Sequence, residues 1–333
     1  MEKFDFKSLR STATQRLAGA EYDPKKLILL HTGASALVMI VLLLIQHILQ
    51  GQIDQTGGLS GLGLRSILST ASSSLNFLVN LVMPFWSFGY LYASLQMARQ
   101  LPAAPDTLLE GFRRFGGVLR LCLIRALIYT AVALLCFYPS ALIYLVTPLS
   151  DSLVDAAMPF ITADGMLNQT ALLEAGEAAM DQFTLGLLPF AGIFLALYAV
   201  TVLPLYYKFR MADYALLEDR RIGAFAALWM SARMMKGNRL RLLQLDLRFW
   251  WFYVLELLTV CICYADTLLA LAGITLPISS EVLFYGSYLA YLLARIVLYW
   301  WAKNPVAVTY ALVYDQLKPE DLPRLPENQP PQY

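Results

Sequence analysis

The feature that most constrains this chain is how its basic residues are placed relative to six long apolar segments. Each segment has about 20 or more residues, enough for a helix to cross a bilayer core about 30 Å thick. Of the 25 Lys and Arg residues, only Arg65 falls in a connection that we expect on the outer side. Connections rich in Lys and Arg stay in the cytoplasm. The sequence therefore predicts a multi-pass membrane protein with cytoplasmic N- and C-termini.

The predicted spans cover most of the apolar residues of the chain. They are residues 27–49, 75–98, 119–146, 185–207, 249–272 and 282–302. Because unpaired backbone groups find no water in lipid, only helices or a closed barrel can cross it. The apolar runs lack the period-two alternation of barrel strands. We therefore predict an all-α fold with six transmembrane helices.

The composition agrees with a lipid environment and excludes several functions. The chain is 58% hydrophobic and 15% charged, whereas soluble domains have about 25% charged residues. A net charge of +1 argues against a nucleic-acid partner. No phosphate-binding glycine loop, zinc-protease motif or nucleophile elbow is present. We therefore expect a protein without enzymatic activity, cofactor or metal, and with membrane lipids as partners.

A repeated pattern divides the predicted membrane domain, residues 1–317, into the stretches 1–98, 106–217 and 222–317. Each has an amphipathic segment, then apolar spans, although membrane topology alone could produce the same alternation. We expect the amphipathic segments 4–17, 107–119 and 222–240 to be helices in the cytoplasmic headgroup layer. Thr107 and Glu110 have the spacing of a capping box at a helix start. The tail, residues 318–333, is rich in proline and predicted to be disordered.

Basic residues of the second and third amphipathic segments are candidate contacts for lipid headgroups. A basic residue near an anionic membrane surface contributes about 1 kcal/mol to binding. The candidates are Arg113, Arg114, Arg233, Lys236 and Arg239.

Two charged residues fall inside predicted spans, where an ion is costly and is by default a functional hypothesis. From the rise of a helix, Glu256 and Arg295 both lie roughly 10 to 12 Å from the cytoplasmic boundary. We expect them to form a pair inside the bundle, with either a structural or a transport role. This agreement in depth requires the last span to leave the membrane near Lys303; a boundary near Tyr314 would remove it.

The stretch 214–258 resembles the signature of the bacterial domain-of-unknown-function family 975. The matching residues are Ser231, Met235, Lys236, Gly237, Leu245, Leu247 and Phe249, and the ending at 304–317 is similar too. Arg248 and the aromatic run after it depart from the family pattern. The resemblance implies a multi-span protein of the bacterial plasma membrane with no established activity. More distantly, the family resembles the membrane portions attached to glycerophosphodiester phosphodiesterases.

Three functions remain open. The first is a non-enzymatic module that organises lipid or partner proteins, favoured by the basic amphipathic segments. The second is a secondary transporter or permease component that uses Glu256 and Arg295. The third is a lipid-acting membrane enzyme, which would need catalytic groups gathered at one depth.

The topology is testable with reporter fusions at six positions. Outside signals are expected after Gln50, Asp164 and Pro277, and inside signals after Gln100, Lys236 and Tyr333. The expectation rests on the basic residues of the short connections, which are the strongest determinants of orientation. A cytoplasmic signal at Asp164 would contradict the six-span scheme.

Overall fold

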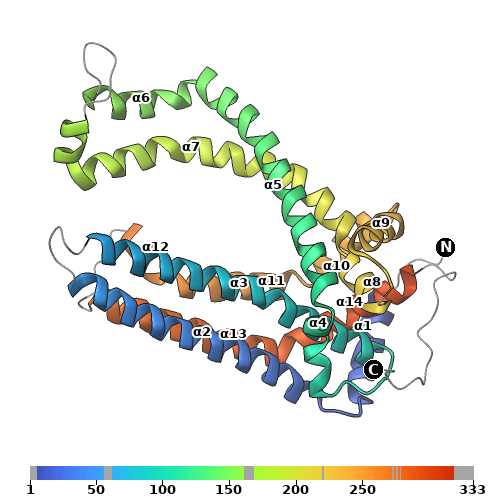
Figure 1. The fold of residues 1–333 in the computed structure, drawn as a ribbon. Helices are drawn as coiled ribbons and strands as arrows, with labels where there is room; N and C mark the ends of the chain where they lie inside the picture. The colour runs from blue at the N-terminus through green and yellow to red at the C-terminus, as the bar shows by residue number, and fades with distance from the viewer. Residues whose placement is uncertain are drawn as a thin grey trace. The chain divides into compact units, whose positions relative to one another are not determined.

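In the computed structural model, helices are the regular secondary structure of the part of the chain that it describes (Figure 1). The described residues are 6–55, 62–160, 169–219, 221–271, 274, 277 and 279–318. No strand occurs among them, so the predicted all-α class is confirmed for these residues. The chain forms two compact units, one of residues 1–121 and 210–333 and one of residues 122–209. The predicted tail from residue 319 onward lies outside the described residues.

Five helices, of which α12 is short, pack along one another in the first unit (Figure 1). They are α2 (Pro24–Gln55), α3 (Leu62–Ala98), α11 (Trp250–Cys263), α12 (Ala265–Leu271) and α13 (Ser280–Leu298). Helix α2 packs against α3 and α13, and α13 also contacts α11 and α12. Large apolar side chains such as Leu37 and Phe77 are 63% and 66% exposed on these helices. Such surfaces match lipid better than water.

Five helices of the described residues are long and apolar enough to cross a membrane. They are Pro24–Leu49, Ser66–Ala98, Phe115–Val146, Phe183–Glu218 and Glu281–Leu317. Each contains one of the predicted spans. The remaining predicted span, 249–272, is divided at Tyr264 into α11, of 14 residues, and α12, of 7. A helix of the length of α11 rises about 21 Å, so the sixth crossing and the threefold repeat stay predictions.

The last long helix changes character near Ala302. Helix α13 runs into the π-helix η5 (Tyr299–Lys303) and then into α14 (Asn304–Leu317). Trp301 is 64% exposed, whereas Tyr314 is fully buried in protein. Pro305 stands in the first turn of α14, where its missing N–H costs little. The candidate span nevertheless runs from Glu281 to Leu317, so a membrane boundary near Lys303 stays a prediction.

The amphipathic segment 107–119 is not one helix. It contains a 3-10 turn η2 (Pro105–Leu109), a short α4 (Glu110–Arg113) and the start of α5 (Phe115–Val146). The predicted capping box is wrong, because the turn begins after Ala104 with no side-chain cap and with proline in its first turn. The Thr107 hydroxyl donates back to the Ala104 carbonyl instead.

The third amphipathic segment, 222–240, also differs from the single helix that we expected. The segment contains α9 (Ala224–Met234) and the first residues of α10 (Arg239–Arg248), and α8 (Ala212–Glu218) precedes it. The chain breaks between α9 and α10 at Gly237, which has a φ of +82°. Only glycine adopts that conformation without steric cost. The first segment is closer to expectation: α1 (Phe6–Ala18) is one helix, packed against α14.

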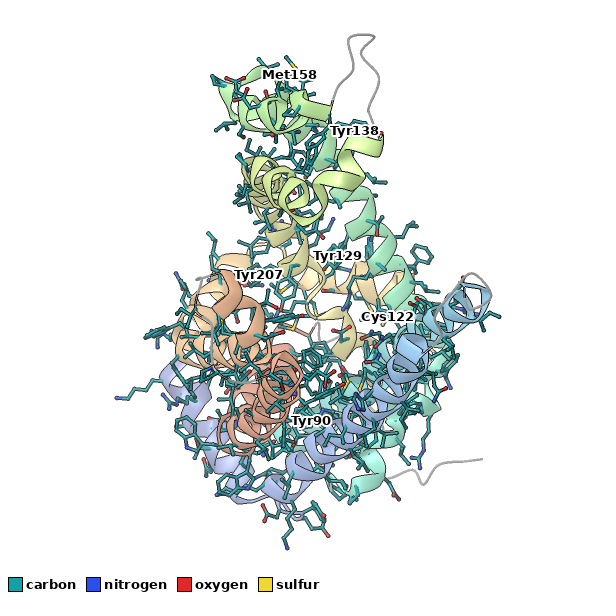
Figure 2. All side chains as sticks on the ribbon, turned by 90° about the vertical axis from the view of Figure 1, so that its left-hand side faces the viewer. Tyr90, Cys122, Tyr129, Tyr138, Met158 and Tyr207 are labelled. Carbon is teal, nitrogen blue, oxygen red and sulfur yellow. The ribbon has the colours of Figure 1, made fainter. Side chains whose placement is uncertain are left out.

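The second unit is built from the end of α5 and from α7 (Gln169–Phe209). Between them lie η3 (Pro148–Ser150), α6 (Asp151–Ala157) and η4 (Met158–Phe160), of which α6 packs on α7. The Tyr144 hydroxyl donates to the Gly186 carbonyl at 2.7 Å, which ties α5 to α7. Tyr138 and Met158 are mostly exposed (Figure 2).

Backbone contact between α3 and the η2–α4 segment depends on two glycines. A Cβ atom on Gly89 would lie 1.8 Å from the Leu108 carbonyl oxygen, and one on Gly111 would lie 1.9 Å from that of Phe85. Both clashes are with backbone atoms, which a rotamer change cannot relieve. These glycines therefore set how closely the segment approaches α3.

We expect Gly89→Ala and Gly111→Ala each to destabilise the protein by about 1 to 3 kcal/mol or more, the usual cost of overpacking. Thermal unfolding in detergent measures the effect. Gly33→Ala is the matched control, because it also lies in a long helix but a Cβ atom added there would meet nothing within 4 Å. That control should be neutral or slightly stabilising. Equal melting temperatures for all three variants would refute the close approach.

Candidate functional site

Polar and aromatic side chains from α2, α3, α11, α13, η5 and α14 meet within the first unit. We call this group the tyrosine cluster, because it is arranged around two tyrosine rings. Its members are His31, Tyr90, Glu256, Arg295, Tyr299, Lys303 and Asn304.

Glu256 and Arg295 both contact Tyr299. The Tyr299 hydroxyl donates to Glu256 Oε1 at 2.6 Å. The Arg295 guanidinium lies 5.1 Å from the centre of the Tyr299 ring, and its Nη1 donates to the Tyr291 hydroxyl at 2.7 Å. No direct ion pair joins Glu256 to Arg295 among the described side chains. The two predicted residues thus belong to one cluster through a tyrosine, and their functional coupling stays a prediction.

Lys303 is a further cation of the cluster. Its Nζ lies 3.8 Å from the centre of the Tyr299 ring and 5.1 Å from that of Tyr90. A cation over an aromatic face is stabilised by about 2 kcal/mol when both are shielded from water. Within the described part of the chain, no carboxylate lies within 4.0 Å of this ammonium group.

Asn304 fixes the position of Tyr90. The Tyr90 hydroxyl donates to Asn304 Oδ1 at 2.7 Å, and Asn304 Nδ2 donates to the Pro24 carbonyl at 2.8 Å. Both side chains are almost fully buried. The amide therefore links α3 and α14 to the start of α2.

His31 connects the cluster to Trp86. Its ring stacks on Tyr90 with the centres 4.9 Å apart and on Trp86 at 5.6 Å. The Trp86 indole donates to the His31 carbonyl at 2.9 Å. His31 is 4% exposed, and its Nδ1 atom has no hydrogen-bond partner within the described chain.

The π-helix η5 supplies Tyr299 and Lys303, and Asn304 follows it directly. Segments of π-helix are rare and often mark functional sites. The sequence predicted neither η5 nor the contribution of Lys303, because Tyr299–Trp301 resembles an ordinary interfacial belt. A signal was present: Arg295, Tyr299 and Lys303 repeat every four residues, the spacing of one helix face.

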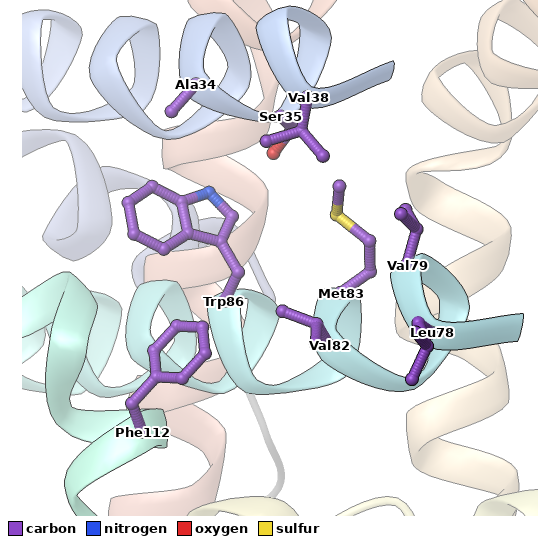
Figure 3. Close-up of a pocket in the computed structure, with 9 residues that line it drawn as sticks. All are labelled: Ala34, Ser35, Val38, Leu78, Val79, Val82, Met83, Trp86 and Phe112. Atoms are coloured by element: carbon purple, nitrogen blue, oxygen red, sulfur yellow. The ribbon is translucent and has the colours of Figure 1, made fainter. Parts of the chain in front are cut away.

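An apolar pocket of ≈ 290 Å³ opens beside the cluster, between α2, α3 and α4 (Figure 3). Figure 3 shows Trp86, Met83 and Val38 pointing into it. The complete lining is Ala34, Ser35, Val38, Leu78, Val79, Val82, Met83, Trp86 and Phe112. Trp86 is thus both a wall of the pocket and the stacking partner of His31.

A separate ion network joins α3, α8 and α14. Arg99 contacts Asp315 at 2.5 Å and Glu218 at 3.0 Å, and Glu218 also accepts from the Tyr314 hydroxyl at 2.5 Å and from Lys318 at 2.5 Å. Burial opposes the charge of Arg99, but the two carboxylates raise its pKa above the ordinary value. Glu218 is 3% exposed. Its charge is compensated on several sides, which is typical of a structural clamp.

A second ionic group fixes α10 and α14. Asp246 accepts hydrogen bonds from Arg210 and from the Tyr310 hydroxyl. The Tyr253 and Tyr310 hydroxyls lie 2.9 Å apart, and the Arg210 guanidinium lies 4.3 Å from the Tyr310 ring centre. This group therefore holds the basic helix α10 against the buried last helix.

One of the five predicted headgroup contacts requires correction. The Arg114 side chain is only 8% exposed and donates to Glu110 and to the Leu216 carbonyl, both at 2.9 Å. Because its donors point into protein, Arg114 is not available to lipid. Its neighbour Arg113 is 54% exposed and lies 3.6 Å from Glu110, so it can still face a membrane surface.

The other three predicted contacts, Arg233, Lys236 and Arg239, are exposed. In α9, Phe225 and Trp229 are 75% and 65% exposed. The opposite face of α9 is buried, and Ser231 accepts a hydrogen bond from the Met211 amide at 3.1 Å. Helix α9 is therefore fixed to the protein on one side while it presents aromatic side chains on the other.

By its fold, the chain is an all-helical protein with several helices of membrane-spanning length in the described part. The particular family follows from comparison with known families. The chain belongs to DUF975, described as a protein of unknown function, whose profile matches residues 7–314. No curated protein and no solved structure matches the chain.

The coupling of Glu256 to Arg295 is measurable by a double-mutant cycle. We expect Glu256→Gln and Arg295→Gln each to lower the melting temperature in detergent, and the double variant to lose less than the sum. A charge left alone at membrane depth is worse than none. Glu281→Gln, an exposed carboxylate in the first turn of α13, is the control. Strictly additive losses would mean that the two residues are independent.

Proposed function

We propose that this protein is an integral protein of the bacterial plasma membrane that organises anionic lipids or partner proteins without enzymatic activity. Its N- and C-termini would lie in the cytoplasm, as the distribution of basic residues predicts. The five apolar helices support a place in a membrane. The match to a family of unknown function leaves the activity open.

The exposed surface of α9 and α10 is the observation that carries this proposal. We call it the α9–α10 surface; its apolar members are Phe225, Trp229, Leu240, Leu247 and Trp250, and its basic members are Arg233, Lys236, Arg239 and Arg248. Large aromatic side chains concentrate at the boundary between membrane and water. Basic residues at the same boundary attract anionic headgroups.

Helices α9 and α10 are each fixed to the rest of the first unit by hydrogen bonds. Helix α9 is held through Ser231, and α10 through Asp246, so both are anchored on the side away from the α9–α10 surface. A small rotation of either helix would therefore not bury the exposed aromatic side chains. The Arg233 guanidinium lies 5.7 Å from the centre of the Trp229 ring. Such a pair places a cation and an interfacial aromatic at the same level.

A second candidate function is a transporter or permease component. The tyrosine cluster supports it, because Glu256 has further polar side chains around it and a π-helix beside it. A substrate-dependent proton flux in liposomes would favour this alternative. The distant resemblance to membrane portions of glycerophosphodiester phosphodiesterases favours instead a link to lipids. A lipid-acting enzyme gains no support from the described residues.

Lipid retention by the purified full chain tests the leading proposal. In mixed micelles of phosphatidylglycerol and phosphatidylcholine, the wild type should enrich the anionic lipid. The variant Arg233→Gln/Lys236→Gln/Arg239→Gln should lose at least about fivefold of that enrichment at low salt, since a single charge already contributes about 1 kcal/mol and three are removed. Mass spectrometry of the retained lipid gives the ratio.

The matched control is Arg233→Lys/Arg239→Lys, which keeps the charge and should keep the enrichment. High salt should reduce the enrichment of the wild type, because exposed charges are screened. Equal retention of neutral and anionic lipid by the wild type would contradict the proposal.

A further inference from the structure

The tyrosine cluster carries an excess of positive charge. Arg295 and Lys303 are two cations, and Glu256 is its single carboxylate. No described carboxylate lies within 4.0 Å of either cation, and Glu256 accepts from Tyr299 instead. An uncompensated cation in surroundings of low dielectric constant is costly. The arrangement therefore favours an additional anion beside the two cations.

Hydrogen-bond donors of the cluster remain available to such an anion. Arg295 has its hydrogen bonds to the tyrosines Tyr291 and Tyr299, which leaves N–H groups over from the five that a guanidinium offers. Among the described residues, Lys303 contacts the rings of Tyr90 and Tyr299 and has no hydrogen bond or ion pair to a side chain. Both residues retain some exposed surface. His31 Nδ1, behind Tyr90, is a further buried polar atom without a partner in the described chain.

The aromatic rings that hold these cations are themselves fixed. Asn304 accepts from the Tyr90 hydroxyl at 2.7 Å, and Glu256 accepts from that of Tyr299 at 2.6 Å. Ordered donors lose little entropy when a ligand binds. A guanidinium matches the oxygen pairs of a phosphate group, and an ammonium adds a point charge.

We propose that the tyrosine cluster is a binding site for a phosphate group, held between Arg295 and Lys303. The group could belong to free inorganic phosphate or to the headgroup of an anionic phospholipid. An apolar pocket lies beside the cluster, because Trp86 lines this pocket and also stacks on His31. The pocket offers room for part of an acyl chain. This site is distinct from the α9–α10 surface and shares no residue with it.

Binding of phosphate compounds to the purified full chain in neutral detergent tests the inference. Three probes are used: inorganic phosphate, dioleoyl phosphatidic acid in mixed micelles, and phosphatidylcholine as the neutral lipid. Phosphorus NMR line broadening reports binding directly. Lys303→Gln and Arg295→Gln should each weaken binding at least about tenfold, as expected for loss of a hydrogen bond to a charged group. Lys303→Arg should retain it.

A matched control separates ligand binding from general charge effects. Lys25→Gln removes an exposed cation that lies 5.0 Å from the Trp300 ring, outside the cluster, and should bind as the wild type does.

The outcomes are distinct. Binding of phosphatidic acid that inorganic phosphate does not displace assigns the site to a lipid headgroup, and displacement assigns it to free phosphate. Sulfate should compete in the wild type, which tests the site even if a variant fails to fold. The inference is overturned if neither phosphate probe binds, or if folded Lys303→Gln and Arg295→Gln bind as the wild type does. Failure of the α9–α10 variants would leave these results unchanged.

Discussion

The constraint on which the rest depends is that polar groups at membrane depth must find partners within the protein itself. Lipid offers no hydrogen bonds, so the backbone groups of each apolar segment must bond within the protein, as they do in a helix. Buried polar side chains follow a similar rule: the hydroxyls of Tyr90 and Tyr299 donate to Asn304 and Glu256. Apolar side chains, in contrast, need no partner and cover the outer faces of the long helices.

Buried ionic contacts organise the part of the first unit where α14 is enclosed. Arg99 with Glu218 and Asp315, and Arg210 with Asp246, connect segments that are far apart in sequence. Removing one partner from such a group leaves an uncompensated charge, which usually costs more than the contact itself contributes. These groups therefore act mainly as determinants of how α8, α10 and α14 are arranged, and they leave α9 free to expose its aromatic face.

The tyrosine cluster differs from those ionic contacts in one respect. The ion network around Arg99 has as many carboxylates as cations. The tyrosine cluster, in contrast, has two cations and a single carboxylate. Aromatic rings, rather than carboxylates, contact the two cations. Such contacts are weaker than a desolvated ion pair. A π-helix is the irregularity that places Tyr299 and Lys303 together. Balanced ionic groups thus maintain the fold, and the unbalanced one is where a ligand is expected.

The sequence by itself determined the helical class and the positions of five long apolar helices, because hydrophobicity is a property of the local chain. Glu256 and Arg295 were also predictable, since a charge inside an apolar run is evident without a structure. Only the tertiary structure decided the breaks at Tyr264 and Gly237, the burial of Arg114 and the enclosure of α14. It also added Tyr90, His31 and Lys303 to the cluster. These features depend on contacts between distant segments, and local periodicity carries no record of such contacts.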